Sequence, residues 1–285
     1  MHFISQFVRE FLIAIQFFTR IPITGRLAEW VGYSPELLRA SAGHFPGVGV
    51  VVGTVAALVF ALLIAQLPQN TLSPLIAAAL STVVTVLLTG GFHEDGMADV
   101  ADGLGGSYNR ERALDIMKDS RVGAFGAMAL VLVLLVKIAL LALLGSIPPE
   151  FESADAEDFS FNFDGWLACA ALWTGHVVSR TLPLVLIALL PHVGDTERSK
   201  SKPLADQIKP SALWVAAFWC FSAIAVASLV LPAINLIVAC SFSMVALLWM
   251  RRMFNRRLQG FTGDCLGATQ QVCEIAFYLG LAIIL

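Results

Sequence analysis

The sequence is short of charge. Asp, Glu, Lys and Arg make up only 14% of its 285 residues, whereas hydrophobic residues make up 58%. With a mean hydropathy of +0.79, this composition excludes an ordinary soluble domain and is typical of a polytopic membrane protein. The formal net charge of −3 is close to neutral, so nucleic acid is not an expected partner.

Two sequence signals are also missing. The five cysteines contain no C-x-x-C pair, and most of them lie in apolar runs, so they predict small buried side chains and exclude a disulfide framework or a zinc site. The first residues lack both a basic stretch and a small-residue cleavage site, so no signal peptide is expected.

Long apolar runs, by contrast, are abundant. A membrane-spanning helix needs roughly 20 apolar residues. The sequence predicts seven such helices, at residues 45–66, 73–91, 123–144, 166–190, 212–231, 233–250 and 269–285. Residues 3–18 mix Arg9 and Glu10 with Phe, Leu and Ile, and predict a helix that either lies in the interface or enters the membrane. We therefore expect an all-α, polytopic helical membrane protein in which residues 1–285 form a single integral membrane domain.

Lys and Arg are missing from alternate loops. Segments 19–43, 92–122, 191–211 and 251–268 each carry three or four of them, whereas 67–72, 145–165 and the turn at Pro232 carry none. Because cytoplasmic loops are enriched in Lys and Arg, the basic loops are expected to face the cytoplasm. The C-terminus and the acidic segment 146–165, interpreted as a solvated spacer, are then expected on the opposite side.

Three carboxylates follow the second predicted span. Asp95, Asp99 and Asp102 are spaced i, i+4 and i+7, which puts them on one face of a helix. Like charges that close repel each other, so the arrangement favours a bound cation, and oxygen ligands suit Mg²⁺. A solvated acidic turn is the alternative. The interleaved glycines, which allow backbone and ligand to approach closely, favour the metal site.

Further polar residues occur in the same set of basic loops. Lys118 and Arg121 can bind phosphate oxygens or can simply anchor the next span at the membrane surface. Lys200 and Lys202 lie in a hydroxyl-rich loop that is either an anion site or a solvated basic loop. The glycine-rich segment 260–268 carries Asp264, which can cap a helix, approach a phosphate or metal, or do both.

Ionisable residues also occur inside predicted spans, where they are costly and usually face a cavity or a partner. Arg180 is the best candidate among them for binding an anionic substrate. His176 is interpreted as a hydrogen-bonded packing residue, and Lys137 as a residue whose long chain reaches the membrane surface. A magnesium-bound carboxylate cluster beside cations at a cytoplasmic face is suited to transferring a phosphoryl-linked group.

The segments 90–103, 116–123 and 262–268 resemble the three signature blocks of the cobalamin synthase family, the adenosylcobinamide-GDP ribazoletransferases. Residues 16–22 and Phe45-Pro46, with Gly49 and Gly53, match further features of that family. The matches occur in the same order over nearly the whole chain. Glu94 stands where the family often has an apolar residue, so it is not expected to be an essential ligand.

The resemblance implies a bacterial inner-membrane enzyme with a cytoplasmic active site and Mg²⁺ as cofactor. Such enzymes join adenosylcobinamide-GDP to α-ribazole or its 5′-phosphate and release GMP. The metal ligands and catalytic residues would be Asp95, Asp99, Asp102 and Asp264, with Asp264 either completing the metal shell or acting as base. The substrate contacts would come from Lys118, Arg121, Arg180, Lys200, Lys202 and Thr262.

Two other classes of protein share some of these features. A CDP-alcohol phosphotransferase of lipid synthesis also has an Asp-rich block at a membrane face, but its pattern has Arg where this chain has Asp99. A transporter would gather its polar residues near the bilayer midplane rather than at one face. The lipid bilayer is a necessary partner in each case, and the sequence leaves the oligomeric state open, a homo-oligomer included.

Overall fold

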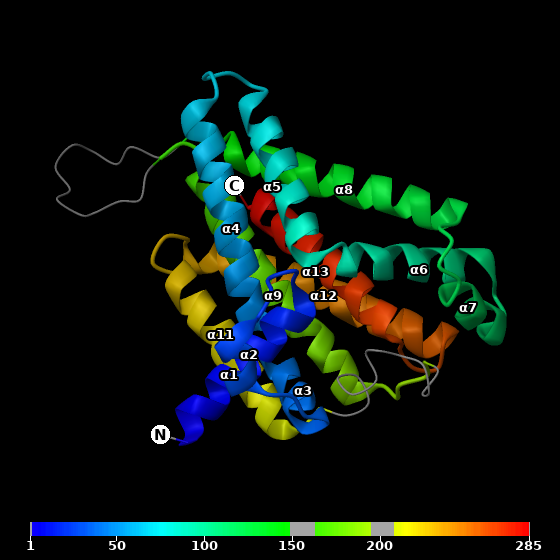
Figure 1. The fold of residues 1–285 in the computed structure, drawn as a ribbon. Coiled ribbons are helices and arrows are strands. Elements are labelled where there is room, and N and C mark those ends of the chain that lie inside the picture. Colours follow the sequence, from blue (N-terminus) through cyan, green and yellow to red (C-terminus); the bar gives the residue numbers. More distant parts are fainter. Residues whose placement is uncertain (1, 149–162, 195–207, 285) are drawn as a thin grey trace.

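The computed structural model describes residues 2–148, 163–194 and 208–284, which form α-helices joined by turns and contain no β-strand (Figure 1). The expected all-α class is therefore confirmed. The helices are α1 (His2–Phe18), α2 (Gly25–Val31), α3 (Pro35–Ser41), the 3-10 turn η1 (Ala42–His44), α4 (Phe45–Gln66), α5 (Ser73–Thr89), α6 (Phe92–Gly106), α7 (Arg110–Met117), α8 (Ala124–Gly145), α9 (Trp166–Leu189), α11 (Pro210–Ala227), α12 (Ala233–Arg257) and α13 (Gly263–Ile283).

Within the described part of the chain, six helices are long and apolar enough to cross a membrane: α4 together with α3 and η1, then α8, α9, α11, α12 and α13. The bent pair α5 and α6 makes a seventh crossing when it is counted as one span. A multi-pass membrane protein is thus confirmed. Helix α1 is not among these candidates, and it packs against α3 and α4.

Three of the predicted spans have ends that differ by four or more residues from those in the structure. Helix α11 ends at Ala227 rather than at residue 231. Helix α12 continues to Arg257 rather than ending at residue 250, because a helix needs no apolar residues and nothing before Gly260 interrupts it. Helix α13 begins at Gly263 rather than at residue 269. The third signature block therefore forms the first turn of a span and not a loop before it.

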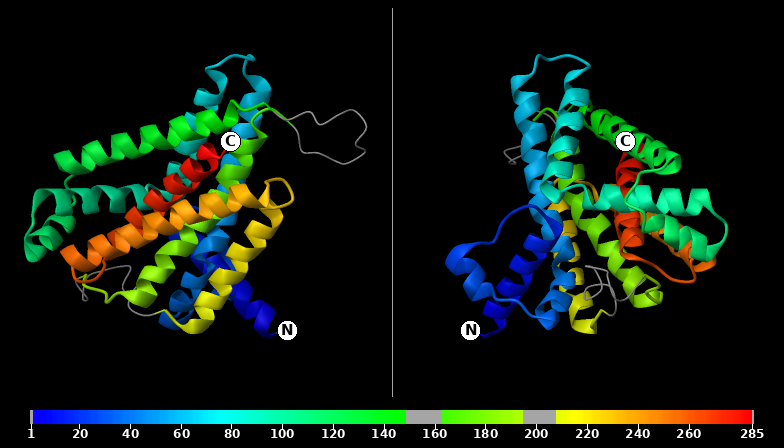
Figure 2. Two further views of the ribbon diagram at one scale, coloured as in Figure 1. Left: turned by 180° about the vertical axis from the view of Figure 1, so that it is seen from behind. Right: turned by 45° about the vertical axis from the view of Figure 1, so that its right-hand side comes forward.

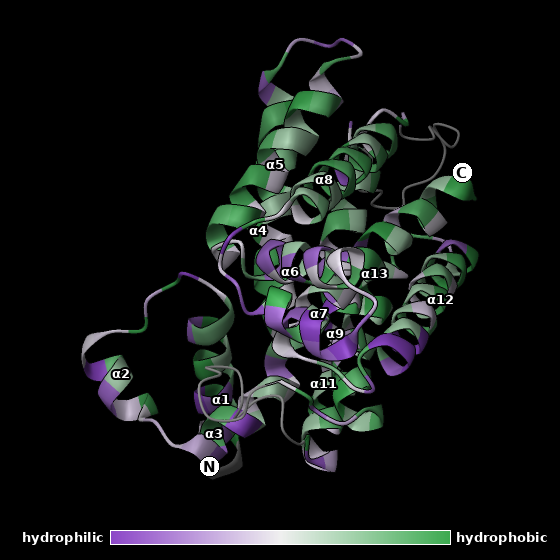
Figure 3. Ribbon diagram, turned by 90° about the vertical axis from the view of Figure 1, so that its right-hand side faces the viewer, coloured by the Kyte–Doolittle hydropathy of each residue, from purple (hydrophilic) through white to green (hydrophobic). Residues whose placement is uncertain are grey.

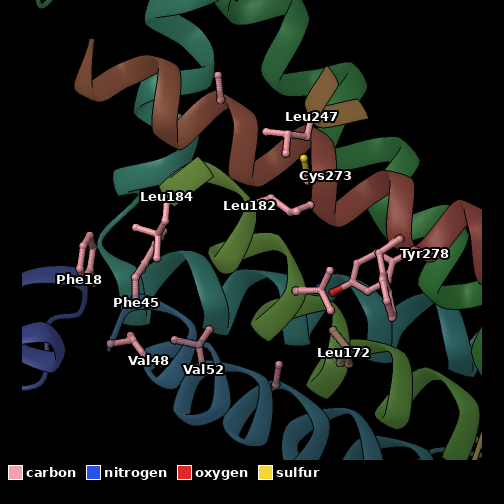
Figure 4. Packing of buried hydrophobic residues seen from close by; sticks show 14 of the residues in the cluster. Phe18, Phe45, Val48, Val52, Leu172, Leu182, Leu184, Leu247, Cys273 and Tyr278 are labelled. Carbon is pink, nitrogen blue, oxygen red and sulfur yellow. The ribbon is translucent and has the colours of Figure 1, made fainter. Parts of the chain in front are cut away.

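Large apolar side chains are exposed on α8, α11 and α12, as expected for helices that face lipid. They include Met128, Val131, Leu132, Leu135, Val136, Trp214, Phe218, Phe221, Ile234, Ile237, Val245 and Leu248. Hydrophilic residues instead gather on α6, α7 and the nearby end of α12 (Figure 3). The buried apolar side chains form one cluster, part of which is shown in Figure 4.

The chain turns sharply between α5 and α6. Gly90 and Gly91 both adopt the left-handed conformation, with φ of 70° and 69°, and the two helix axes differ in direction by 91°. Glycine favours this conformation because it has no Cβ. Helix α6 consequently leaves α5 and runs beside α8 and α13, as the views of Figures 1 and 2 agree.

Candidate active site

Helices α6 and α13 cross at glycines. A Cβ atom on Gly96 would lie 2.7 Å from the carbonyl oxygen of Asp264, and one on Gly267 would lie 3.3 Å from the backbone of His93. Any larger residue at Gly96 would push the helices apart. The close crossing brings the acidic face of α6, with Asp95 and Asp99, next to Asp264 at the start of α13.

The carboxylates at this crossing repel one another. Helix α6 carries four acidic residues. It follows the bend at which the apolar helix α5 ends. Burial, followed by the negative charges of Asp264, Asp95 and Asp102, raises the pKa of Asp99 to about 7. A cation bound here would offset the neighbouring negative charges, so the site favours cation binding.

Asp102 has partners that its spacing did not predict. Its two carboxylate oxygens accept hydrogen bonds from the backbone N–H groups of Gly123 and Gly126, at 2.7 and 2.8 Å. A Cβ on either glycine would lie 2.4 Å from this carboxylate. The side chain therefore stabilises the start of α8, where free N–H groups and the helix dipole favour an anion.

The first turn of α13 is capped by Thr262. Its hydroxyl oxygen accepts a hydrogen bond from the N–H of Cys265 at 3.4 Å, and the hydroxyl donates to Asp264 Oδ2 at 3.2 Å. Of the two roles considered for Asp264, that of helix cap is therefore wrong. Asp264 instead lies within the first turn, where its carboxylate faces the acidic face of α6.

The two predicted phosphate-binding residues near α7 are exposed. Lys118 ends α7 and lies 4.0 Å from Asp115, with 49% of its side chain exposed. The Arg121 side chain is 87% exposed and donates hydrogen bonds to Asp119. These hydrogen bonds lower the pKa of Asp119 to about 2. Lys200 and Lys202 lie outside the described residues.

Arg180 lies in a buried polar cluster rather than on the acidic face. Its guanidinium contacts His176 Nδ1 at 2.8 Å and donates to the His176 carbonyl at 3.1 Å. His176 Nδ1 lies 3.4 Å from Glu274 of α13. Only 2% of Arg180 is exposed, so in this conformation the residue contributes to the packing of the bundle. The interpretation of His176 as a hydrogen-bonded packing residue agrees with this geometry.

Lys137 belongs to the same cluster. Its Nζ lies 2.6 Å from Glu274 Oε1, and both side chains are buried. The expectation that Lys137 reaches the membrane surface was wrong, because a buried carboxylate on α13 provides a closer partner for its charge. Glu274 was missed in the sequence, although a carboxylate within an apolar span is itself a signal.

A chain of side chains links this cluster to the acidic face. Gln270 donates to Glu274, Gln271 donates to Gln270 Oε1 at 3.0 Å, and Gln271 also donates to Glu94 Oε1 at 3.0 Å. Glu94 directly precedes Asp95 on α6. Its carboxylate thus connects α6 to α13 from the buried side, a role that agrees with its exclusion from the expected metal ligands.

In the part of the chain that the structure describes, no three His, Cys, Asp or Glu side chains are close enough to hold a metal ion among them. This does not conflict with Mg²⁺, which usually keeps several waters and is bound by one or two carboxylates together with substrate phosphates. Asp95, Asp99 and Asp264 provide oxygen ligands and excess negative charge. The donor set therefore fits Mg²⁺ that enters with a pyrophosphate substrate.

The apolar spans and the carboxylate site at the crossing of α6 and α13 define a polytopic membrane protein with an acidic site that suits phosphoryl chemistry. Comparison with known proteins extends this class to a family. The model of the cobalamin-5-phosphate synthase family matches residues 10–282, and the chain belongs to that family. The resemblance of the three signature blocks is thereby confirmed.

Similar proteins include the adenosylcobinamide-GDP ribazoletransferase of Polaromonas naphthalenivorans, which is 71% identical over 98% of this chain and 99% of its own length. The proteins of the same name from Albidiferax ferrireducens and Shewanella piezotolerans are 58% and 41% identical, over 98% and 96% of this chain and 99% and 95% of their own lengths. No solved structure matches the chain. These relatives do not favour the alternative of a CDP-alcohol phosphotransferase.

Proposed function

We propose that this chain joins adenosylcobinamide-GDP to α-ribazole or its 5′-phosphate, releasing GMP and forming adenosylcobalamin or its 5′-phosphate. The observation that carries the proposal is the crossing at Gly96, which places Asp264 of the third signature block beside the acidic face formed by the first. The names of full-length relatives support the same activity.

The carboxylates supply the chemistry. Asp95, Asp99 and Asp264 would hold Mg²⁺, which neutralises the charge of the pyrophosphate when it is bound. Because the GMP that leaves keeps its own phosphate, the ribazole hydroxyl attacks the phosphorus attached to cobinamide. The bond from that phosphorus to the bridging oxygen then breaks. Asp264, when it does not complete the metal shell, is our candidate for the general base that takes the hydroxyl proton.

Lys118 and Arg121, with Lys200 and Lys202, are the proposed contacts for the substrate phosphates. Both described residues have exposed side chains on the connection from α7 to α8. Asp102 holds this connection to α6 through Gly123. Thr262 orients Asp264 through its hydroxyl, and the buried Arg180 is left out of the proposed contacts.

We further propose that the protein lies in the bacterial inner membrane with the acidic site facing the cytoplasm, where charged nucleotide substrates and Mg²⁺ are available. The distribution of Lys and Arg among the loops supports this orientation.

Purified protein in liposomes, incubated with adenosylcobinamide-GDP, α-ribazole and Mg²⁺, should form GMP and a cobalamin in equal amounts. Omission of Mg²⁺ should abolish both products. A parallel reaction with a CDP-alcohol and a lipid acceptor should give no product. Turnover in that reaction, with none in the first, would assign the site to lipid synthesis.

A further inference from the structure

An aromatic pocket lies next to the start of α13, the helix that carries Asp264. Five of its lining residues are rings contributed by three helices: Phe17 and Phe18 of α1, Phe45 of α4, and Phe92 and His93 of α6. The same residues occur in segments that the sequence singled out, 16–22, 45–46 and 90–103, and the proposed phosphoryl chemistry uses none of the phenylalanines. The pocket therefore needs a separate explanation.

The lining rings contact one another in stacked and edge-on pairs. Phe18 stacks on Phe45 with ring centroids 4.2 Å apart, and Phe45 stacks on His93 at 5.6 Å with an interplanar angle of 9°. Phe92 meets His93 edge-on at 5.5 Å. Figure 4 shows Phe18, Phe45 and Leu184, which also line this pocket, at one end of the buried cluster. Stacked and edge-on contacts of this kind are the favoured geometries for aromatic groups.

The pocket adjoins the proposed reaction site. Gly263 and Gly267 line it from the first turn of α13, the turn that carries Asp264. On the other side, Phe92 and His93 line it from the first turn of α6. A molecule bound in the pocket would thus lie next to the turn of α13 that carries Asp264.

We infer that this pocket binds the planar aromatic base of the ribazole acceptor, so that the attached ribose lies toward Asp264 at the start of α13. The inference rests on the proposed function and adds to it the location of one substrate group. It also gives the aromatic residues of α1 and α4 a role in positioning the attacking hydroxyl.

The lining favours this occupant over the other parts of the substrates. Its exposed surface is apolar, which does not suit a phosphate, a ribose or a guanine with its many polar groups. The cavity is small, about 40 Å³, so it excludes a corrin ring and must widen to take a planar base. Phe92 is 40% exposed, so its ring can turn outward to admit a flat base.

One polar atom in the lining also lacks a partner. His93 is buried, and its Nε2 atom makes no hydrogen bond within the described structure. Leaving such an atom unpaired is costly, so a bound base whose ring nitrogen reached Nε2 as the pocket widened would gain a hydrogen bond. A lipid acyl chain, the other apolar candidate, offers neither a stacking face nor a hydrogen-bonding atom.

The test compares Phe92→Leu, which removes an aromatic ring, with Phe92→Tyr, which keeps it, and with Phe221→Leu, a matched change on the exposed face of α11. Phe92→Leu should raise the KM for α-ribazole about three- to tenfold, the range expected for loss of an aromatic pair. The KM for adenosylcobinamide-GDP should stay unchanged. Phe92→Tyr should raise the KM for α-ribazole less than Phe92→Leu does, because it keeps the ring, and only Phe221→Leu should resemble the wild type.

An unchanged KM for α-ribazole in an active Phe92→Leu enzyme would overturn the inference while leaving the proposed function intact. A rise confined to adenosylcobinamide-GDP would also overturn it. A second measurement on the unmodified protein covers the case in which the variant does not fold. A free planar base should compete with α-ribazole at least about tenfold better than a saturated analogue of equal size, and equal competition would refute the inference.

Discussion

The carboxylate of Asp102 accepts a hydrogen bond from the backbone N–H of Gly123 at 2.7 Å, which joins the first signature block to the second. Gly123 is the residue before α8, so Asp102 acts as a cap for a membrane span that lies 21 residues further along the chain. This contact distinguishes Asp102 from Asp95 and Asp99, whose carboxylates accept no hydrogen bond from a backbone N–H of the described residues.

Asp102→Asn should lower stability. The NH2 group of the Asn side chain would face the backbone N–H of either Gly123 or Gly126, so one of the two hydrogen bonds would be lost. Loss of a charge-assisted hydrogen bond costs about 1.5–3 kcal/mol. The unfolding midpoint of the purified variant in detergent should therefore fall, while the Mg²⁺ dependence of any remaining activity should match the wild type. A variant with wild-type stability and altered Mg²⁺ dependence would return Asp102 to the set of metal ligands.

Asp95→Asn and Asp264→Asn should behave in the opposite way. Each removes a negative charge from the crossing of α6 and α13, so turnover should fall at least about a hundredfold, the scale expected when electrostatic stabilisation of a transition state is lost. Their unfolding midpoints should not decrease, since like charges repel at this site. Near-normal turnover with unchanged Mg²⁺ dependence would remove the substituted residue from the proposed site.

Asp99 should make stability depend on pH when Mg²⁺ is absent. Its pKa is raised to about 7, so between roughly pH 4 and pH 7 the folded protein retains a proton that the unfolded chain releases. Stability should therefore decrease as the pH rises through this range. The unfolding midpoint should fall less in Asp99→Asn than in the wild type between pH 5 and pH 8. Parallel curves for the two proteins would contradict the raised pKa.

Lys137→Met should be strongly destabilising, because it leaves Glu274 buried without its closest cation. Removal of one partner from a buried ion pair costs about 3–5 kcal/mol. The double variant Lys137→Met/Glu274→Gln should recover most of the folded protein, measured as monodisperse protein after extraction. Arg26→Met, at an exposed site on α2, serves as the control. No recovery in the double variant would show that Glu274 is needed for reasons other than its charge.

The orientation predicted from the basic loops can be measured by labelling single cysteines in a cysteine-free background. Position 155 should react with an impermeant reagent from outside, whereas positions 108 and 200 should react only after the membrane is opened. Tyr108 is 92% exposed, so a cysteine at that position should be accessible to the reagent. Reaction at position 108 from outside would reverse both the topology and the proposed access of cytoplasmic substrates.

The spans and the family could be predicted from the sequence because their signals are local. An apolar run of about 20 residues must form a helix in lipid, where its backbone groups have no water to bind. The ends were less certain, since hydropathy drops at Arg251 while α12 continues to Arg257. The signature blocks likewise identified the acidic face of α6 and the turn that carries Asp264.

Helical spacing nevertheless predicts only which face of its own helix a residue lies on. It does not predict which other helix packs against that face. Asp95, Asp99 and Asp102 share one face of α6, yet Asp102 contacts the start of α8 while Asp99 faces Asp264. The same limit applied to Lys137, whose partner Glu274 lies more than a hundred residues away in the sequence. No local pattern indicates which distant helix supplies a neighbour.

The sequence by itself therefore determined which segments cross the membrane, which blocks carry the carboxylates, and to which family the chain belongs. Only the tertiary structure decided which of those carboxylates meet, which one caps a helix, and which cations are buried with Glu274. The physical reason is that these contacts depend on how closely the helices pack. That packing is set by the two left-handed glycines that turn α6 away from α5, and by Gly96, which lets α6 touch α13.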